Sequence, residues 1–236
     1  MNSVQNTNVL VAKVPRIDDE AAASLFDGKF GIGDIEEIYL SYLADVISQL
    51  NRHQKTRVII LYHSQSMFEV LTQMSHAPAE LRLIGPKDTG QIYSPIIERL
   101  FKSGQCKNMI LLLTLHPLVN YQILGHALRL LNLEDDSVVV GTLSNHVPYL
   151  LGMRNPHGAF LTLRDPDYCD TEALLHGCCS INGLVNPLNS LPAIQTVEDL
   201  SALREKLERL CESRHDYPKR TLSLLRQLDN THMTAG

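Results

Sequence analysis

Short apolar runs alternate along the chain with longer segments in which apolar residues recur at helical spacing. The runs that predict strands are 8–14, 57–62, 80–84, 108–114, 137–141, 147–153 and 159–163. The segments that predict helices are 20–26, 34–51, 64–74, 91–102, 117–131, 170–176, 197–214 and 218–228. This alternation is typical of βαβ units. It predicts an α/β fold, a Rossmann-like and mostly parallel open sheet with flanking helices.

Local residues refine this pattern at several element ends. Asp34 and Thr196 stand where a side chain can cap the first turn of a helix, and Pro117 is a favourable first residue for one. The run 108–114 is the most apolar, so we expect that strand at the centre of the sheet. Residues 154–158 resemble a hairpin turn.

Domain organisation is expected to be simple, because no internal repeat, low-complexity stretch or linker interrupts the pattern. We expect residues 1–215 to form a single α/β domain. Residues 216–236 are expected to add a C-terminal helix and a frayed tail.

Composition narrows the classes of function. Of 236 residues, 44% are hydrophobic, and the formal net charge is -5. An acidic chain without a basic run argues against nucleic-acid binding and against an anionic membrane surface. No apolar stretch is long enough to span a bilayer, and the polar N-terminus lacks the order of a signal peptide. Five irregularly spaced cysteines suggest free thiols. We therefore expect a cytoplasmic protein.

Four short segments, taken in order, are similar to the motifs of one protein family. They are VLVAKVP (9–15), DTGQ (88–91), VVGTLSNHVPYLLGM (139–153) and LPAIQTVEDL (191–200). They resemble bacterial glycosyltransferase-A-like proteins, the nucleotide-diphospho-sugar transferases of the radical-SAM/selenodomain-associated type. The family's motifs are Ala-Lys-x-Pro, Asp-Leu-Gly-Glu, Val-Leu-Gly-Pro followed by Gly-Gly-Tyr-Tyr-Leu-Ile-Gly-Leu, and Asp-x-Asp-Thr-Pro-Glu-Asp-Leu. The resemblance implies ligand-binding positions at Lys13, Asp88, Gly90, Thr114 and Gly141.

The sequence departs from the family where transfer chemistry needs carboxylates. Leu115 stands at the acid of the family's Ser-Asp-Cys-Pro, and Asn145 at the acid of its Glu-Asp-Gly-Gly. Ala193-Ile194-Gln195 replaces its final Asp-x-Asp, and its basic first loop has no counterpart. A hard divalent cation bound to a diphosphate requires oxygen ligands, mainly carboxylates. We therefore expect a degenerate active site and no cofactor.

Other residues offer alternative sites. His116, Asn145 and His146 could form a neutral polar pocket or serve acid–base chemistry, or they could simply be hydrogen-bonded residues of the sheet end. Asp165 and Asp167 have the spacing of a metal-binding Asp-x-Asp but also suit a solvated turn. A further cluster could bind zinc or be structural, and its residues are Cys169, His176, Cys178 and Cys179. The glycines Gly28, Gly31 and Gly33 could bind a phosphate or form an ordinary loop.

Three functions remain open from the sequence. The first is a nucleotide-diphospho-sugar-transferase-like protein that has lost metal-dependent catalysis and acts by binding a protein partner or a ligand. The second is an active glycosyl- or nucleotidyltransferase with a rearranged site, for which Mg²⁺ or Mn²⁺ would be needed. The third is a nucleotide-sensing regulatory module. The expected partners are a protein or a second copy of the chain, and a nucleotide or nucleotide sugar.

Overall fold

The computed structural model describes residues 7–50, 56–74, 79–84, 92–157, 160, 176–178, 180, 183–213 and 216–232. Its strands are β1 (Thr7–Lys13), β2 (Thr56–Tyr62), β3 (Ala79–Leu83), β4 (Cys106–Leu112), β5 (Val138–Thr142), β6 (Pro148–Met153) and β7 (Val185–Pro187). Its helices are α1 (Asp19–Ser24), the 3-10 turn η1 (Leu25–Gly28), α2 (Ile32–Leu50), α3 (Gln65–Met74), α4 (Ser94–Lys102), α5 (Tyr121–Leu131), α8 (Val197–Ser213) and α9 (Lys219–His232).

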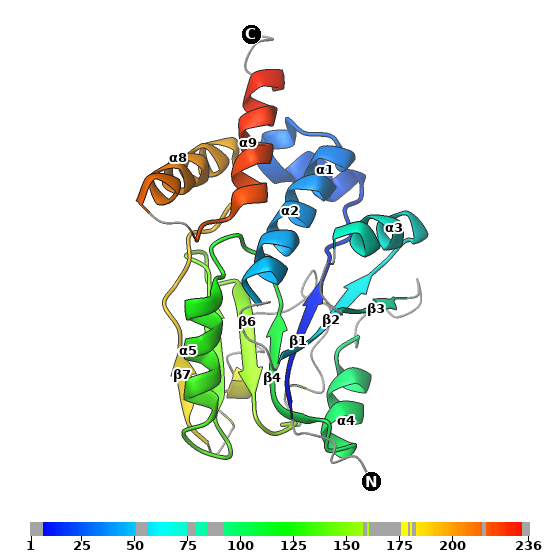
Figure 1. Cartoon of the computed structure of the whole chain (residues 1–236), viewed down its shortest axis with the longest axis vertical. Helices are drawn as coiled ribbons and strands as arrows, with labels where there is room; N and C mark the ends of the chain where they lie inside the picture. Colours follow the sequence, from blue (N-terminus) through cyan, green and yellow to red (C-terminus); the bar gives the residue numbers. More distant parts are fainter. Residues whose placement is uncertain are drawn as a thin grey trace.

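The strands form one sheet in the order β3-β2-β1-β4-β6-β5-β7. Strands β1, β2, β3 and β4 are parallel to one another, β5 is parallel to β7, and β6 runs antiparallel between β4 and β5. β4 lies in the middle, as its continuous apolar run predicts (Figure 1). The predicted mostly parallel α/β sheet is therefore confirmed.

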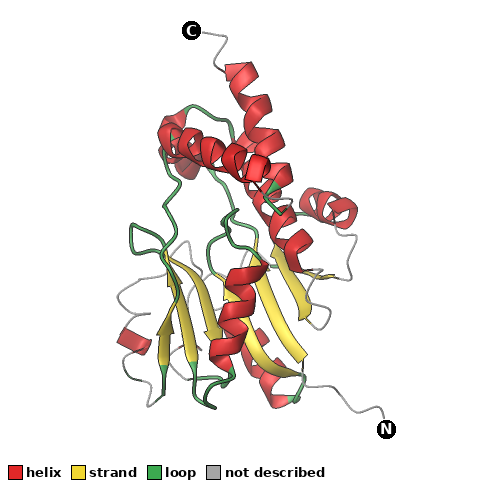
Figure 2. Cartoon of the chain, turned by 60° about the vertical axis from the view of Figure 1, so that its left-hand side comes forward, coloured by secondary structure: helices red, strands yellow, loops and turns green. Residues whose placement is uncertain are grey.

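Two hydrophobic cores cover the two faces of the sheet. Side chains alternate along each strand, so Leu10 and Ala12 of β1 face one core while Val9 and Val11 face the other. The larger core packs the sheet against α2, α3, α5, α8 and α9. The smaller core packs it against α4. Figure 2 shows the helical layer that gathers at one end of the sheet.

Capping explains where several helices begin. The predicted capping box of α8 is present, because Asp199 N–H donates to Thr196 Oγ1 (3.1 Å) and Asp199 Oδ2 accepts from Thr196 N–H (2.9 Å). Asp34 lies inside the first turn of α2, where Oδ2 accepts from Gly31 N–H at 3.0 Å. The prediction that Asp34 precedes the helix is thus wrong by three residues, because α2 begins at Ile32 and Gly31 precedes it.

The prediction that Pro117 opens a helix is also wrong. α5 begins at Tyr121, and Asn120 caps it by accepting 3.0 Å hydrogen bonds from the N–H groups of Gln122 and Ile123. An Asx cap satisfies two helical donors, which proline at the first position cannot do. Residues 116–119 form a separate turn, closed by Val119 N–H donating to the His116 carbonyl at 3.1 Å.

The hairpin of the sheet lies elsewhere than predicted. β5 and β6 are joined through 143–147, where His146 adopts a left-handed φ of 67° and its N–H donates to Leu143 O at 2.9 Å. At the predicted hairpin, Phe160 is helical and its N–H donates to His157 O. The rest of the expected strand 159–163, and residues 170–175 of the expected helix, lie outside the described residues.

None of the helices in the described part of the chain combines the length and the apolar character needed to span a bilayer.

Candidate functional site

The carboxyl ends of the parallel strands meet at the upper end of the sheet in Figure 1. The chain leaves β1 toward β2 and β3 on one side, whereas β4 lies on the other side of β1. A crevice outside the strand ends at such a reversal is where open α/β sheets bind ligands. The residues that follow β1, β2, β3, β4 and β5 therefore define the candidate site.

A cavity of about 340 Å³ opens at the ends of β1, β2 and β3. We call it the strand-end cavity, and its lining residues are Pro15, Arg16, Ile17, Glu36, His63, Ser64, Met67 and Ile84. Its volume lies at the lower end of the range for small-molecule sites, and its lining mixes apolar side chains with a few polar ones.

Two features make the strand-end cavity suited to an anionic group. Arg16 closely follows β1 and is exposed at the cavity. Ser64 begins α3, since its Oγ accepts from Met67 N–H at 3.3 Å and its carbonyl accepts from Phe68 N–H at 3.3 Å. The N-terminus of a helix attracts negative charge through its unpaired N–H groups, and a guanidinium binds phosphate in a bidentate manner.

The ends of β4 and β5 are closed by the segment 189–195. Backbone hydrogen bonds join Leu191 N–H to Thr142 O (3.1 Å) and Ser144 N–H to Leu191 O (2.8 Å). Ser144 Oγ also accepts from Ala193 N–H at 2.9 Å. The segment thus continues the edge of the sheet and lies across the half of the site where the sequence places His116, Asn145 and His146.

His116 is part of this closure. Its Nε2 donates to Pro192 O at 3.0 Å and its Nδ1 accepts from Leu118 N–H at 3.2 Å, so both ring nitrogens have backbone partners. The side chain is buried, and burial lowers the pKa of His116 to about 4, against the hydrogen bond to Pro192, which raises it. The nearby charge of Lys206 lowers this pKa further. This arrangement fixes a neutral imidazole as a structural tie between β4 and the 189–195 segment.

The three positions that the resemblance sets against the family's acids are Leu115, Asn145 and Gln195. Leu115 is buried in the larger core, and Asn145 is exposed with Oδ1 accepting from Val147 N–H at 3.3 Å. The carbonyl of Gln195 accepts from Phe26 N–H at 2.7 Å, which ties the 189–195 segment to the first loop. Within the described residues, no group of three His, Cys, Asp or Glu side chains could hold a metal ion.

The ligand-binding positions implied by the resemblance fall in different surroundings. Lys13 is buried at the end of β1 and has an interaction partner. Thr114 Oγ1 donates to Pro148 O at 3.1 Å. A Cβ on Gly141 would stand 2.4 Å from Tyr149 Cζ, so this glycine makes room for the tyrosine ring. Asp88, Gly90, Asp165 and Asp167 lie outside the described residues.

The remaining candidates are loop and core residues where the structure describes them. Cys178 is buried in the smaller core, His176 lies in the same short helical turn, and Cys169 and Cys179 lie outside the described residues. Gly28, at a left-handed φ of 65°, is the last residue of η1.

Sequence reasoning did not identify Glu36, His63 and Ser64 as site residues. His63 and Ser64 directly follow β2, and position after a parallel strand is the feature that could have indicated them. Glu36 reaches the cavity from the second turn of α2, which depends on how that helix packs over β1 and β2. Arg16 was visible in the sequence, but its acidic neighbours argued against a diphosphate site.

Comparison with solved structures identifies the class of fold. A putative nucleotide-diphospho-sugar transferase from Desulfovibrio desulfuricans G20 superposes with a TM-score of 0.75 at 18% identity, covering 98% of each chain. A cytidylyltransferase from Leptospira borgpetersenii covers 98% of each chain with a TM-score of 0.52 and 10% identity. A 4-diphosphocytidyl-2C-methyl-D-erythritol synthase matches at a TM-score of 0.53 and 10% identity over 86% of this chain and 99% of its own.

The protein therefore has the nucleotide-diphospho-sugar-transferase-like fold, shared with cytidylyltransferases. Neither a protein-family model nor a curated protein matches the sequence.

Proposed function

We propose that this protein binds a nucleotide or nucleotide sugar in the strand-end cavity and does not transfer the sugar through a carboxylate-held metal ion. The observation that carries the proposal is the division of the strand-end site. Its half at β1, β2 and β3 is a cavity with a cationic side chain and a helix N-terminus. Its half at β4 and β5 is covered by the 189–195 segment.

The lining of the strand-end cavity supports this class of ligand. Arg16 and the first turn of α3 can hold a phosphate, because both present N–H donors and positive charge. The carboxylate of Glu36 can accept hydrogen bonds from ribose hydroxyls, while Met67 and Ile84 offer apolar surface to a base. The fold neighbours, named as transferases of nucleotide sugars and cytidylyl groups, favour the same ligands.

The loss of metal-dependent transfer is inferred from side-chain chemistry. Leu115 has no ligand atom, and Asn145 is neutral with its amide oxygen engaged in a turn. Gln195 is held by its backbone to the first loop. The motifs of the radical-SAM-associated transferases suggest an ancestor with acids at these three places. We infer that the ligand-bound protein acts through contact with a protein partner instead of through chemistry.

The experiment is calorimetric titration of the protein with nucleoside mono- and diphosphates and nucleotide sugars, each with and without Mn²⁺. We expect binding whose affinity is independent of Mn²⁺, and no release of nucleotide from the sugar donor. Arg16→Glu should weaken binding about tenfold or more, since it reverses a charge at the phosphate position.

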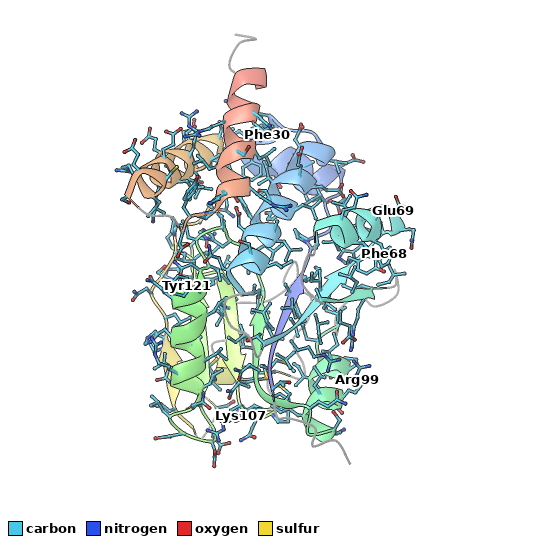
Figure 3. All side chains as sticks on the ribbon, in the orientation of Figure 1. Phe30, Phe68, Glu69, Arg99, Lys107 and Tyr121 are labelled. Carbon is cyan, nitrogen blue, oxygen red and sulfur yellow. The ribbon has the colours of Figure 1, made fainter. Side chains whose placement is uncertain are left out.

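Lys107→Glu is the matched control, because Lys107 is an exposed cation at the opposite end of the sheet (Figure 3). It carries the same charge change and should leave affinity unaltered. Binding that requires Mn²⁺, together with turnover, would instead establish the transferase with a rearranged site. An absence of binding by every nucleotide would refute the proposal.

A further inference from the structure

Strand β3 forms one edge of the sheet and lies at its right-hand side in Figure 1. The opposite edge strand, β7, has three residues and ends at Pro187, which cannot donate a ladder hydrogen bond. β3 has five residues without proline, and Leu83 at its end is 59% exposed. The two edges of the sheet are therefore protected differently.

The backbone direction of β3 follows from its contact with β2. Ile84 N–H donates to Tyr62 O at 2.7 Å, so residue 84 directs its backbone groups toward β2. Because these directions alternate along a strand, Glu80 and Arg82 also direct theirs inward. The N–H and C=O groups of Ala79, Leu81 and Leu83 are then directed to the outer edge.

The side chains of β3 alternate between the two faces of the sheet. Glu80 lies beside Ile59 in register and binds Arg57 of β2 and Arg82 of β3, with Arg99 of α4 at 3.8 Å. This places the charged residues on the α4 face, where Arg99 is seen in Figure 3. Ala79 and Leu81 pack against the larger core on the opposite face.

We propose that β3 pairs antiparallel with β3 of a second copy of this chain, about a two-fold axis at Leu81. In this register Leu81 faces the partner's Leu81, and Ala79 faces the partner's Leu83. The backbone N–H and C=O groups of these three residues are directed to the outer edge. Each of the three residue pairs can therefore exchange two backbone hydrogen bonds, about six in total. The exposed side chain of Leu83 becomes covered by an apolar cross-strand neighbour.

Charge complementarity favours a second copy of this chain as the partner of β3, and it favours the antiparallel direction of pairing. Glu80 faces the partner's Arg82 at a non-hydrogen-bonded pair, where opposed side chains approach most closely. The two-fold axis repeats the contact between Arg82 and the partner's Glu80. A parallel pairing of the same two edges would set the charged face of one copy beside the apolar face of the other, so Glu80 and Arg82 would find no partner of opposite charge. The sequence Ala-Glu-Leu-Arg-Leu is thus self-complementary only in the antiparallel arrangement.

The test uses charge variants that can associate only with each other. Glu80→Lys opposes two cations to each other in its own dimer, and Arg82→Glu opposes two anions. Each variant alone should sediment as a monomer at concentrations where the unaltered protein is a dimer. An equimolar mixture should restore a one-to-one heterodimer, because both cations on β3 of the first variant then face anions on β3 of the second.

Leu83→Pro supplies an independent test in case the charge variants unfold. It removes one outward N–H at an exposed side chain and leaves the ladder to β2 intact, so it should shift the sedimentation toward monomer. Leu83→Asp is a third variant, which places a charge where the apolar cross-strand contact is expected. Its matched control is Leu133→Asp, because Leu133 is 63% exposed and lies in the turn after α5, away from the edge.

Dissociation by Leu83→Asp but not by Leu133→Asp supports the proposal. An unaltered protein that is monomeric at high micromolar concentration would overturn it. So would a dimer that persists in correctly folded Leu83→Pro, or a mixture of the charge variants that stays monomeric while each is folded by circular dichroism.

Discussion

The carboxylate of Asp45, in the second half of α2, accepts a 2.9 Å hydrogen bond from the backbone N–H of Thr221 at the start of α9. Its other oxygen accepts from Arg220 N–H at 3.1 Å. Thr221 is fully buried, and its hydroxyl lies 3.4 Å from that of Ser41. An acid from one helix thus caps another that is distant in sequence and holds it on the larger core.

Asp45→Ala should lower the free energy of unfolding by about 1–2 kcal/mol, because it leaves two N–H groups of α9 without an acceptor. Chemical denaturation measures the change. Glu37→Ala is the control, since Glu37 is exposed on the same helix and should change stability by less than about 0.5 kcal/mol. Equal effects of the two substitutions would show that the cap is not what secures α9.

The stability conferred by Asp45 should depend on pH. Burial raises the pKa of this carboxyl, although the N–H donors and the charge of Arg220 oppose the shift. A folded-state pKa above the unfolded value stabilises the fold most at low pH, and this contribution is lost as the pH rises through the folded pKa. Stability relative to Asp45→Asn, which does not ionise, should therefore decline with rising pH. A difference that is constant with pH would contradict a pKa raised by burial.

His116 should have the opposite dependence. Its pKa falls from 6.5 to about 4 on folding, so neutral His116 stabilises the protein above pH 6.5 and this contribution is lost as the pH falls toward 4. The loss should be on the order of 3 kcal/mol relative to His116→Gln, which has no charge to acquire. Denaturation of both proteins across that range measures it, and parallel curves would argue that the imidazole is solvated in the folded state.

Gly141→Ala should destabilise the protein by about 1–3 kcal/mol through overpacking. The added Cβ would lie 2.4 Å from Tyr149 Cζ, and Tyr149 is itself held by its hydroxyl donating to Asn189 O at 3.2 Å. The cost should shrink in the background of Tyr149→Leu, which a double-mutant cycle measures. Gly33→Ala is the control, because no atom other than those of its chain neighbours and of the local helix backbone lies within 4 Å of its added Cβ. If the destabilisations by Gly141→Ala and Tyr149→Leu are additive, the contact between the added Cβ and the tyrosine ring is not the cause of the destabilisation.

His146→Asn should raise the free energy of unfolding by up to about 1 kcal/mol, because asparagine tolerates the left-handed backbone better than histidine. A higher melting temperature would show this increase. His146 is exposed with φ of 67°, so little packing is lost. His146→Val should have the opposite effect, since a branched Cβ is strained at this φ. If both substitutions lower stability alike, the imidazole makes a contribution that the turn geometry does not explain.

The fold class could be predicted from the sequence because strands and helices are indicated by residues that are close together in the chain. Continuous apolar runs such as 57–62 indicated buried parallel strands, and Thr196 with Asp199 indicated the start of α8. The errors also have local causes. Pro117 suits a helix start but stands in a turn, because Asn120 offers the better cap. The 143–147 connection forms a hairpin through the left-handed backbone of His146, although glycine and asparagine are the residues that adopt this conformation most readily.

The candidate site was less accessible to sequence reasoning. Leu115, Asn145 and His116 could be placed at strand ends, but not the backbone of 189–195 that closes over them. The strand-end cavity could be foreseen only in part, since His63 follows a predicted strand, whereas Glu36 joins the lining of the cavity from α2.

What the sequence alone determined is the order and kind of most elements and the lack of a charged side chain at Leu115, Asn145 and Gln195, because periodicity and side-chain chemistry are carried by each residue wherever it lies. What only the tertiary structure decided is which strand ends stay open, which histidine is buried in its neutral form, and which strands form the two edges of the sheet. Those outcomes depend on contacts between segments far apart in the chain, such as Asp45 with Thr221 and His116 with Pro192, and their geometry exists only once the sheet and its helices have packed.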